Sequence, residues 1–116
     1  MTVEEIFNKL AAHMVEGIMI HDELSQGYDF LGFEGFSLCH NNHHIEETHG
    51  YMRLCHYYSC HYHKLINLNT IPQPNIIPPN WRKYTTMEVD TTTKREAVKT
   101  MMTKWVEWER DTKKLY

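Results

Sequence analysis

The stretch FSLCHNNHHIEETHGYM, residues 36–52, decides the fold of this chain. It holds no proline and a single glycine, Gly50, and its apolar residues Leu38, Ile45 and Met52 recur every seven positions. That spacing is typical of residues that share one face of a helix. The pattern predicts one long helix from about residue 36 to 67. Its Tyr and His residues have only middling helix propensity, so packing must hold it together.

The segment before this stretch predicts a first helix over residues 3–26. Its stripe recurs at spacings of three and four residues: Ile6, Leu10, His13, Gly17, Ile20 and Leu24. Residues 27–35 then bring three glycines into nine positions, which favours a turn between two antiparallel helices.

All four prolines follow the second helix and exclude a helix there, because each removes a backbone donor. A crossover is therefore predicted over about residues 68–92, long for a loop. A third helix over 93–115 is predicted to begin at the capping box Thr93-x-x-Glu96. It carries the apolar stripe Val98, Met101, Trp105, Trp108, Thr112 and Leu115. Residues 1–116 thus predict a single all-α domain.

Composition argues against several classes of function. The formal net charge is −3, which does not suit a nucleic-acid or polybasic membrane surface. No stretch approaches the roughly 20 apolar residues of a membrane span, and the acidic N-terminus does not look like a secretory signal. The odd count of three cysteines favours free thiols and a cytoplasmic location.

Histidines are the unusual feature, with nine in the chain and seven of them between residues 40 and 63. Histidine is a frequent metal ligand. In Glu46-x-x-His49 the spacing of three places a carboxylate and an imidazole on one helix face, the unit with which helical bundles hold paired iron or manganese ions. A chain of this composition is expected to contain such a spacing about once by chance, so the motif indicates a metal site only together with other features of the sequence.

The order of these features resembles the ferritin-like superfamily. Glu16 lies on the first helix, Gly35-Phe36 opens the second with Glu46 and His49, and a long crossover leads to Glu109 within Trp-Glu-Arg on the third. The resemblance implies an antiparallel helical bundle with a di-iron or di-manganese site. Its implied ligands are Glu16, Glu46, His49 and Glu109, and its implied chemistry is iron oxidation or reaction with oxygen or peroxide, as in a ferroxidase-like or di-iron oxidoreductase.

No fourth helix with a second Glu-x-x-His follows, which departs from the family pattern. Some ferritin-like half-bundles complete their site across a two-fold dimer, so the resemblance implies a homodimer or a higher homo-oligomer. Dimerisation would also cover a flank of Val98, Trp105 and Trp108, which is otherwise expected to be an exposed apolar patch.

Two other hypotheses stay open. One is a metal-free helical protein-protein interaction module, which would leave the four predicted ligands apart and solvated. The other is a zinc-binding module built on the cluster from Cys55 to His63, where His56 and Cys60 share a helix face. The pair His40 and His44 has the same spacing, and His13 is a further candidate to replace or supplement Glu16.

Overall fold

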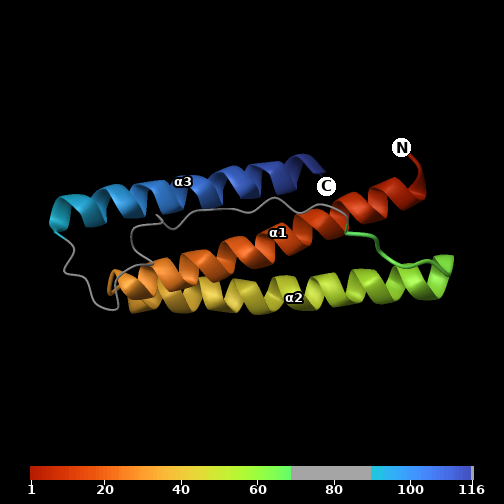
Figure 1. Ribbon diagram of the computed structural model, residues 1–116, viewed down its shortest axis with the longest axis horizontal. Helices are drawn as coiled ribbons and strands as arrows, with labels where there is room; N and C mark the ends of the chain where they lie inside the picture. Colours follow the sequence, from red (N-terminus) through yellow and green to blue (C-terminus); the bar gives the residue numbers. More distant parts are fainter. Residues whose placement is uncertain (69–89, 116) are drawn as a thin grey trace.

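The computed structural model describes residues 1–68 and 90–115, and all regular secondary structure within them is helical. The three helices are α1 (Val3–Phe30), α2 (Glu34–Tyr62) and α3 (Thr91–Leu115). In Figure 1, α1 and α2 form an antiparallel hairpin, and α3 lies along α1 and runs in the direction of α2. The all-α prediction is confirmed.

The start and end of α1 are both set by local hydrogen bonds. Thr2 and Glu5 form a reciprocal capping box at its start. At its end, Gly32 adopts a left-handed φ of 86°, while the Phe33 N–H donates to the Tyr28 carbonyl at 2.8 Å. This is a Schellman-type ending that suits a glycine. The predicted turn between the helices does lie within residues 27–35, but it is narrower than predicted, because α1 continues through Gly27 to Phe30 and the chain turns only at residues 31–33.

Helix α2 begins two residues before its predicted start and ends five residues before its predicted end. His63 takes a left-handed φ of 55°, and its N–H donates to the Ser59 carbonyl at 3.0 Å. Beyond it the chain is fastened to the start of α1. Lys64 Nζ lies 3.2 Å from Glu4 Oε2, and the Asn67 N–H donates to Asn8 Oδ1 at 2.8 Å.

Helix α3 begins at Thr91 because Asp90 caps it, and Asp90 Oδ1 accepts the Thr93 N–H at 2.7 Å. The predicted capping box at Thr93 is wrong as a helix start, since Thr93 already lies inside the helix. Most of the predicted crossover over 68–92, with its prolines, lies outside the described residues.

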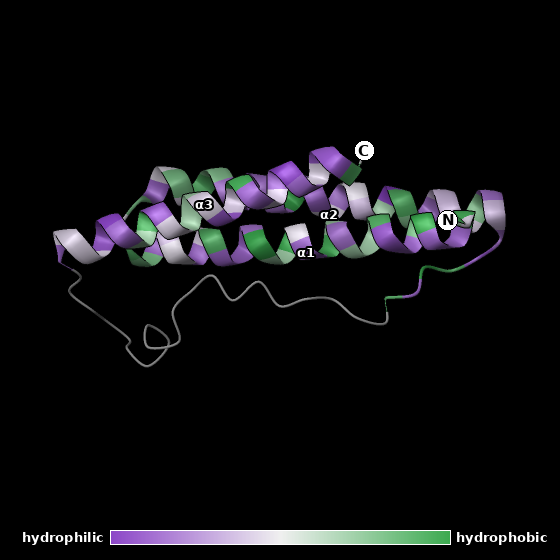
Figure 2. Ribbon diagram, turned by 90° about the horizontal axis from the view of Figure 1, so that it is seen from above, coloured by the Kyte–Doolittle hydropathy of each residue, from purple (hydrophilic) through white to green (hydrophobic). Residues whose placement is uncertain are grey.

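The core follows one side of α1. Its buried cluster is Ile20, Leu24, Tyr28, Leu31, Met101 and Trp108. Trp108 is only 4% exposed, and its indole lies directly over Gly17, where a Cβ would overlap the ring. Val98 and Trp105 pack against the same cluster, so the predicted exposed flank on the third helix is wrong: the α1–α2 hairpin covers it. Figure 2 shows hydrophilic residues along all three helices, so the apolar core is narrow.

Candidate functional site

A pair of buried imidazoles lies where the three helices meet. His21 of α1 is fully buried and His40 of α2 is 2% exposed. Their Nδ1 atoms are 3.1 Å apart, the distance of a hydrogen bond in which one imidazole N–H donates to the other ring. His21 belongs to a buried stripe on α1, with Gly17, Leu24 and Tyr28. Their spacings of four, three and four residues place all four on the face of α1 that is turned toward the core.

Aromatic rings enclose this pair. The His40 ring stacks on Tyr28 at a centroid distance of 5.5 Å and meets the Trp105 ring edge-on at 4.8 Å. A third imidazole, His43, stacks beside His21 at 5.0 Å and lies 6.1 Å from His40. We refer to His21, His40 and His43 as the histidine junction.

Burial makes the two inner imidazoles weak bases. Burial, together with a smaller effect of the neighbouring imidazoles, lowers the pKa of His21 to about 3 and the pKa of His40 to about 4. Both rings are therefore neutral at neutral pH. The Nε2 atom of His21 is buried with no hydrogen-bond partner among the described residues, which is a costly arrangement for a polar atom.

Two predicted ligands, Glu46 and His49, lie on α2 and are exposed. The Glu46 carboxylate is 3.6 Å from His43 Nδ1. The carboxylate of α2 that turns toward α3 is its neighbour Glu47, whose pKa is raised by burial and by the nearby Glu109 charge.

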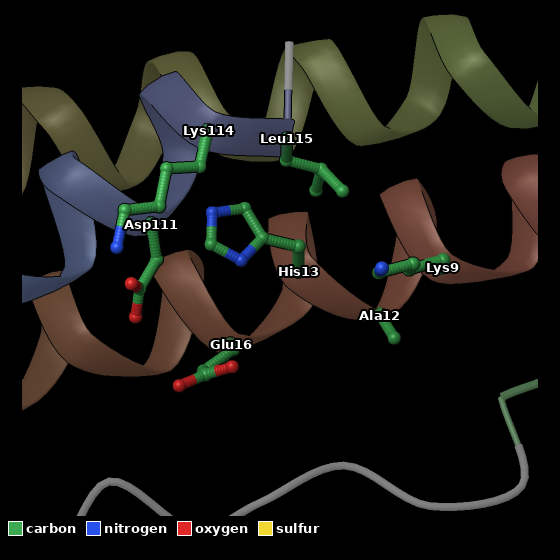
Figure 3. Close-up of a pocket in the computed structure, with 7 residues that line it drawn as sticks. All are labelled: Lys9, Ala12, His13, Glu16, Asp111, Lys114 and Leu115. Carbon is green, nitrogen blue, oxygen red and sulfur yellow. The ribbon is translucent and has the colours of Figure 1, made fainter.

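The other two predicted ligands lie elsewhere. Glu109 accepts a hydrogen bond from Trp105 Nε1 at 3.2 Å. Glu16 lines a cavity of about 370 Å³ between α1 and α3, shown in Figure 3, and its pKa is raised by burial and by the Asp111 charge. Across the described parts of the chain, no three or more His, Cys, Asp or Glu side chains are grouped so as to hold a metal ion.

His13 takes part in the packing of α3 and also lines the cavity of Figure 3. Its ring stacks on Trp108 at 4.7 Å, and its Nε2 lies 2.6 Å from Thr112 Oγ1. Burial lowers its pKa. His13 therefore joins α1 to α3 beside Glu16.

The structure places the residues of the two alternative sites as follows. In the predicted zinc cluster, Cys60 Sγ comes within 3.6 Å of the His56 ring, but both residues are exposed. His40 and His44 have different partners, because His44 Nδ1 donates to the Ile18 carbonyl at 3.0 Å while His40 faces His21.

The outer face of α2, which turns away from α1 and α3, carries an unexpected set of residues. Leu38, Ile45 and Met52, on which the second-helix prediction rested, are 61%, 46% and 61% exposed. They form one strip with the exposed polar residues Asn42, His49 and His56, and we call these six residues the outer strip. The helix was predicted correctly, but its apolar stripe lies on the solvent side.

Sequence reasoning missed His21 as a site residue. The signal was present, since His21 lies four positions after Gly17 and three before Leu24, but the predicted stripe was drawn through its neighbour Ile20 instead. Comparison with known proteins adds no family: no family model, curated protein or solved structure matches the chain. Among the described residues, none of the helices has the length and apolar character needed to cross a bilayer.

Proposed function

We propose that this protein is a helical interaction module that self-associates through the outer strip of α2. The observation that carries the proposal is the exposure of Leu38, Ile45 and Met52 on one face of a 29-residue helix. Large apolar side chains in line on a helix are the usual contact surface for another helix.

The spacing within the outer strip suits helix pairing. Leu38, Ile45 and Met52 repeat every seven residues, and Asn42, His49 and His56 repeat at the same interval four positions later. A seven-residue repeat of this kind makes a seam between two helices, and polar residues at one seam position select register and partner. The strip therefore favours a specific pairing over general adhesion.

Charge at the ends of the strip favours a second copy in antiparallel orientation. Exposed Glu34 lies at the start of α2, whereas exposed Arg53 lies in its last third. Antiparallel pairing brings the acidic end of each helix toward the basic end of the other, while parallel pairing sets like charges side by side. A two-fold axis near the middle of α2 satisfies this arrangement.

Sedimentation velocity over a range of protein concentrations tests self-association. We expect a concentration-dependent dimer that Ile45→Glu abolishes, because the substitution puts a charge on the seam. Val106→Glu is the matched control, since Val106 is 44% exposed but lies on α3. A monomer at every concentration, or equal loss in both variants, would contradict the proposal.

The ferritin-like di-metal site is a second candidate, and one observation favours it. Glu46 and His49 are both exposed, His49 within the outer strip and Glu46 next to its Ile45, so self-association through α2 would bring two Glu46-x-x-His49 units toward each other. Their carboxylates would supply hard oxygen ligands, and His49 a nitrogen, for iron or manganese. Such a pair of ions supports iron oxidation or reaction with oxygen or peroxide.

Metal analysis by mass spectrometry separates this candidate from a plain interaction module. The protein is purified without a histidine tag, beside a Glu46→Ala and His49→Ala double variant. Iron or manganese bound to the dimer and lost in the double variant supports the di-metal site. If both proteins form the dimer and neither contains iron or manganese, the di-metal site is contradicted and the plain interaction module is supported.

A further inference from the structure

We propose that the outer face of α3 is a docking site for an acidic amphipathic helix of a partner protein. Six exposed residues follow one another along this face, and we call them the basic stripe: Arg95, Lys99, Met102, Val106, Arg110 and Lys113. The stripe lies on α3 and not on α2, so this site is separate from the outer strip and from self-association.

The spacing of the basic stripe places its side chains in one line. Its members are four, three, four, four and three residues apart, and such steps return to the same side of an α-helix. At a rise of about 1.5 Å per residue, the distance from Arg95 to Lys113 is about 27 Å, or about five turns. The buried residues Met101 and Trp108 are on another side of α3, toward the hairpin and the histidine junction.

Charge is distributed unevenly between the helices. Helices α1 and α2 together carry nine Asp or Glu and two Lys or Arg, whereas α3 carries four Asp or Glu and seven Lys or Arg. The four cations of the basic stripe are exposed, and within the described residues none of them forms an ion pair. Their charge therefore does not serve to hold α3 on the acidic hairpin, and it is available to an anionic partner.

The middle of the basic stripe is apolar. Met102 is 39% exposed and Val106 is 44% exposed, and they lie one turn apart with two cations on either side. A cavity of about 380 Å³ adjoins them on α3 and is lined by Trp105, Val106, Glu109, Arg110 and Lys113. One aliphatic side chain of a partner fits such a cavity, while the cations beyond it bind carboxylates.

The acidic residue in this lining does not oppose an anionic partner directly. Glu109 Oε1 accepts a hydrogen bond from Trp105 Nε1 at 3.2 Å, so the carboxylate is turned along the flank of α3 toward Trp105. Its position in the helix is also one residue before Arg110, about 100° around the helix. The cations of the stripe therefore stay open to carboxylates of a partner.

An acidic helix fits this pattern better than a nucleic acid or a membrane does. Nucleic acids are held mainly through their phosphates, which would leave Met102 and Val106 without a contact. Membrane-surface helices present a wider apolar face with large aromatic or leucine side chains. A helix with aliphatic residues at its centre and glutamates toward both ends contacts all six residues of the stripe at once.

Fluorescence anisotropy with a labelled peptide tests the proposal. The probe is an amphipathic helical peptide of about 18 residues, with two leucines at its centre and glutamates on the same face toward both ends. We expect saturable binding to the tag-free full chain, weakened by added salt because the ion pairs are exposed. A peptide with glutamine in place of glutamate, and a scrambled peptide of the same composition, should each bind about tenfold more weakly.

Paired substitutions locate the binding face. Lys99→Gln with Arg110→Gln should weaken binding of the probe about tenfold, because two exposed ion pairs are lost while helix propensity is kept. Lys9→Gln with Lys104→Gln is the matched control, since it makes the same change in net charge at exposed residues outside the stripe. It should leave the affinity unchanged. Ile45→Glu should also leave it unchanged, so a failure of self-association is distinguishable from a failure of this proposal.

Circular dichroism checks the helical content of each variant, and Arg95→Gln with Lys113→Gln replaces the first pair if that pair loses helix. The proposal is overturned by absence of binding to the glutamate peptide, by equal binding of the scrambled peptide, or by an equal loss in the control pair. It is also overturned by tighter binding to vesicles of phosphatidylcholine and phosphatidylserine, or to a short DNA duplex, than to the peptide. The basic stripe would then belong to a membrane or a nucleic-acid contact.

Discussion

The two sides of α2 invert the usual arrangement of a surface helix. The side toward α1 and α3 buries His40 and half-buries His43 and Glu47, while the outer side exposes Leu38 and Met52. An ordinary amphipathic helix hides its apolar residues and shows its polar ones. Here α1 packs against α2 largely through aromatic and imidazole rings, and the aliphatic side chains Leu38 and Met52 face solvent.

This difference teaches that an apolar repeat locates a helix without saying which surface it contacts. The inner side carries the cost of buried polar groups, and such groups are retained where they specify structure or bind something. The outer side carries the cost of exposed apolar area, which a partner would remove. Each side can be tested separately.

The largest expected effect comes from Trp108, which joins α3 to the inner side. Trp108→Ala should lower the free energy of unfolding by about 3–5 kcal/mol, as for other buried tryptophans. Met52→Ala on the outer strip should change it by less than about 0.5 kcal/mol, since Met52 is exposed within the chain. Urea denaturation of dilute protein measures both. Similar losses from the two substitutions would remove the distinction between the sides.

The second-largest expected effect is a fall in the free energy of unfolding at acidic pH, caused by the buried imidazoles on the inner side of α2. Above the ordinary histidine pKa of 6.5 the folded and unfolded chains both keep His21 and His40 neutral, and the contribution is fully present. Below it only the unfolded chain takes up protons, so the free energy of unfolding falls until the folded pKa values of about 3 and 4 are reached. Near pH 5 the loss is about 2 kcal/mol for each imidazole.

This pH dependence is measured by urea denaturation in a series of buffers from about pH 7 down to about pH 4. The neighbouring imidazoles that act on the pair are His43 and His44 for His21, and His43 for His40. A His21→Phe and His40→Phe double variant should show a clearly shallower slope between pH 6.5 and 4. An unchanged slope would mean that the buried pair is not its source.

Smaller effects on the free energy of unfolding, of opposite sign, are expected when two glycines within helices are replaced by alanine. In Gly17→Ala the new methyl group meets the Trp108 indole, so the free energy of unfolding should fall by about 1–3 kcal/mol. In Gly50→Ala the methyl meets only Met14 Cε, at 3.9 Å, so better helix propensity should raise it by about 0.5–1 kcal/mol. Thermal unfolding of both variants checks the sign. A stabilising Gly17→Ala would show that α3 does not approach α1 so closely.

The existence of three helices was predictable, because a long segment without proline and with regular apolar spacing rarely forms another structure. The residues at which each helix begins and ends were harder to predict. The glycines at 27 and 35 suggested a wide turn, yet only Gly32 needs a left-handed backbone, and no pattern distinguishes it from the other two. Asp90 was overlooked because Thr93 and Glu96 matched a capping box one turn later.

The candidate site was harder to predict, because neighbouring residues on a helix point about 100° apart. A shift of one residue therefore turns Glu47 toward α3 and leaves Glu46 in solvent. The ligand assignment to Glu16, Glu46, His49 and Glu109 stays a prediction that requires a second copy. His21 and His40 come from different helices, nineteen residues apart, and only the packing of the hairpin reveals that they meet.

The tight turn at Gly32 also bears on the order in which the molecule assembles. It joins α1 and α2 through residues 31–33, so their contacts close a short loop at little entropic cost. Helix α3 must instead be brought back across the stretch that separates Tyr62 from Thr91, and closing a longer loop is slower. We therefore expect the hairpin to form first, with its imidazoles still hydrated, and the tryptophans of α3 to expel that water last.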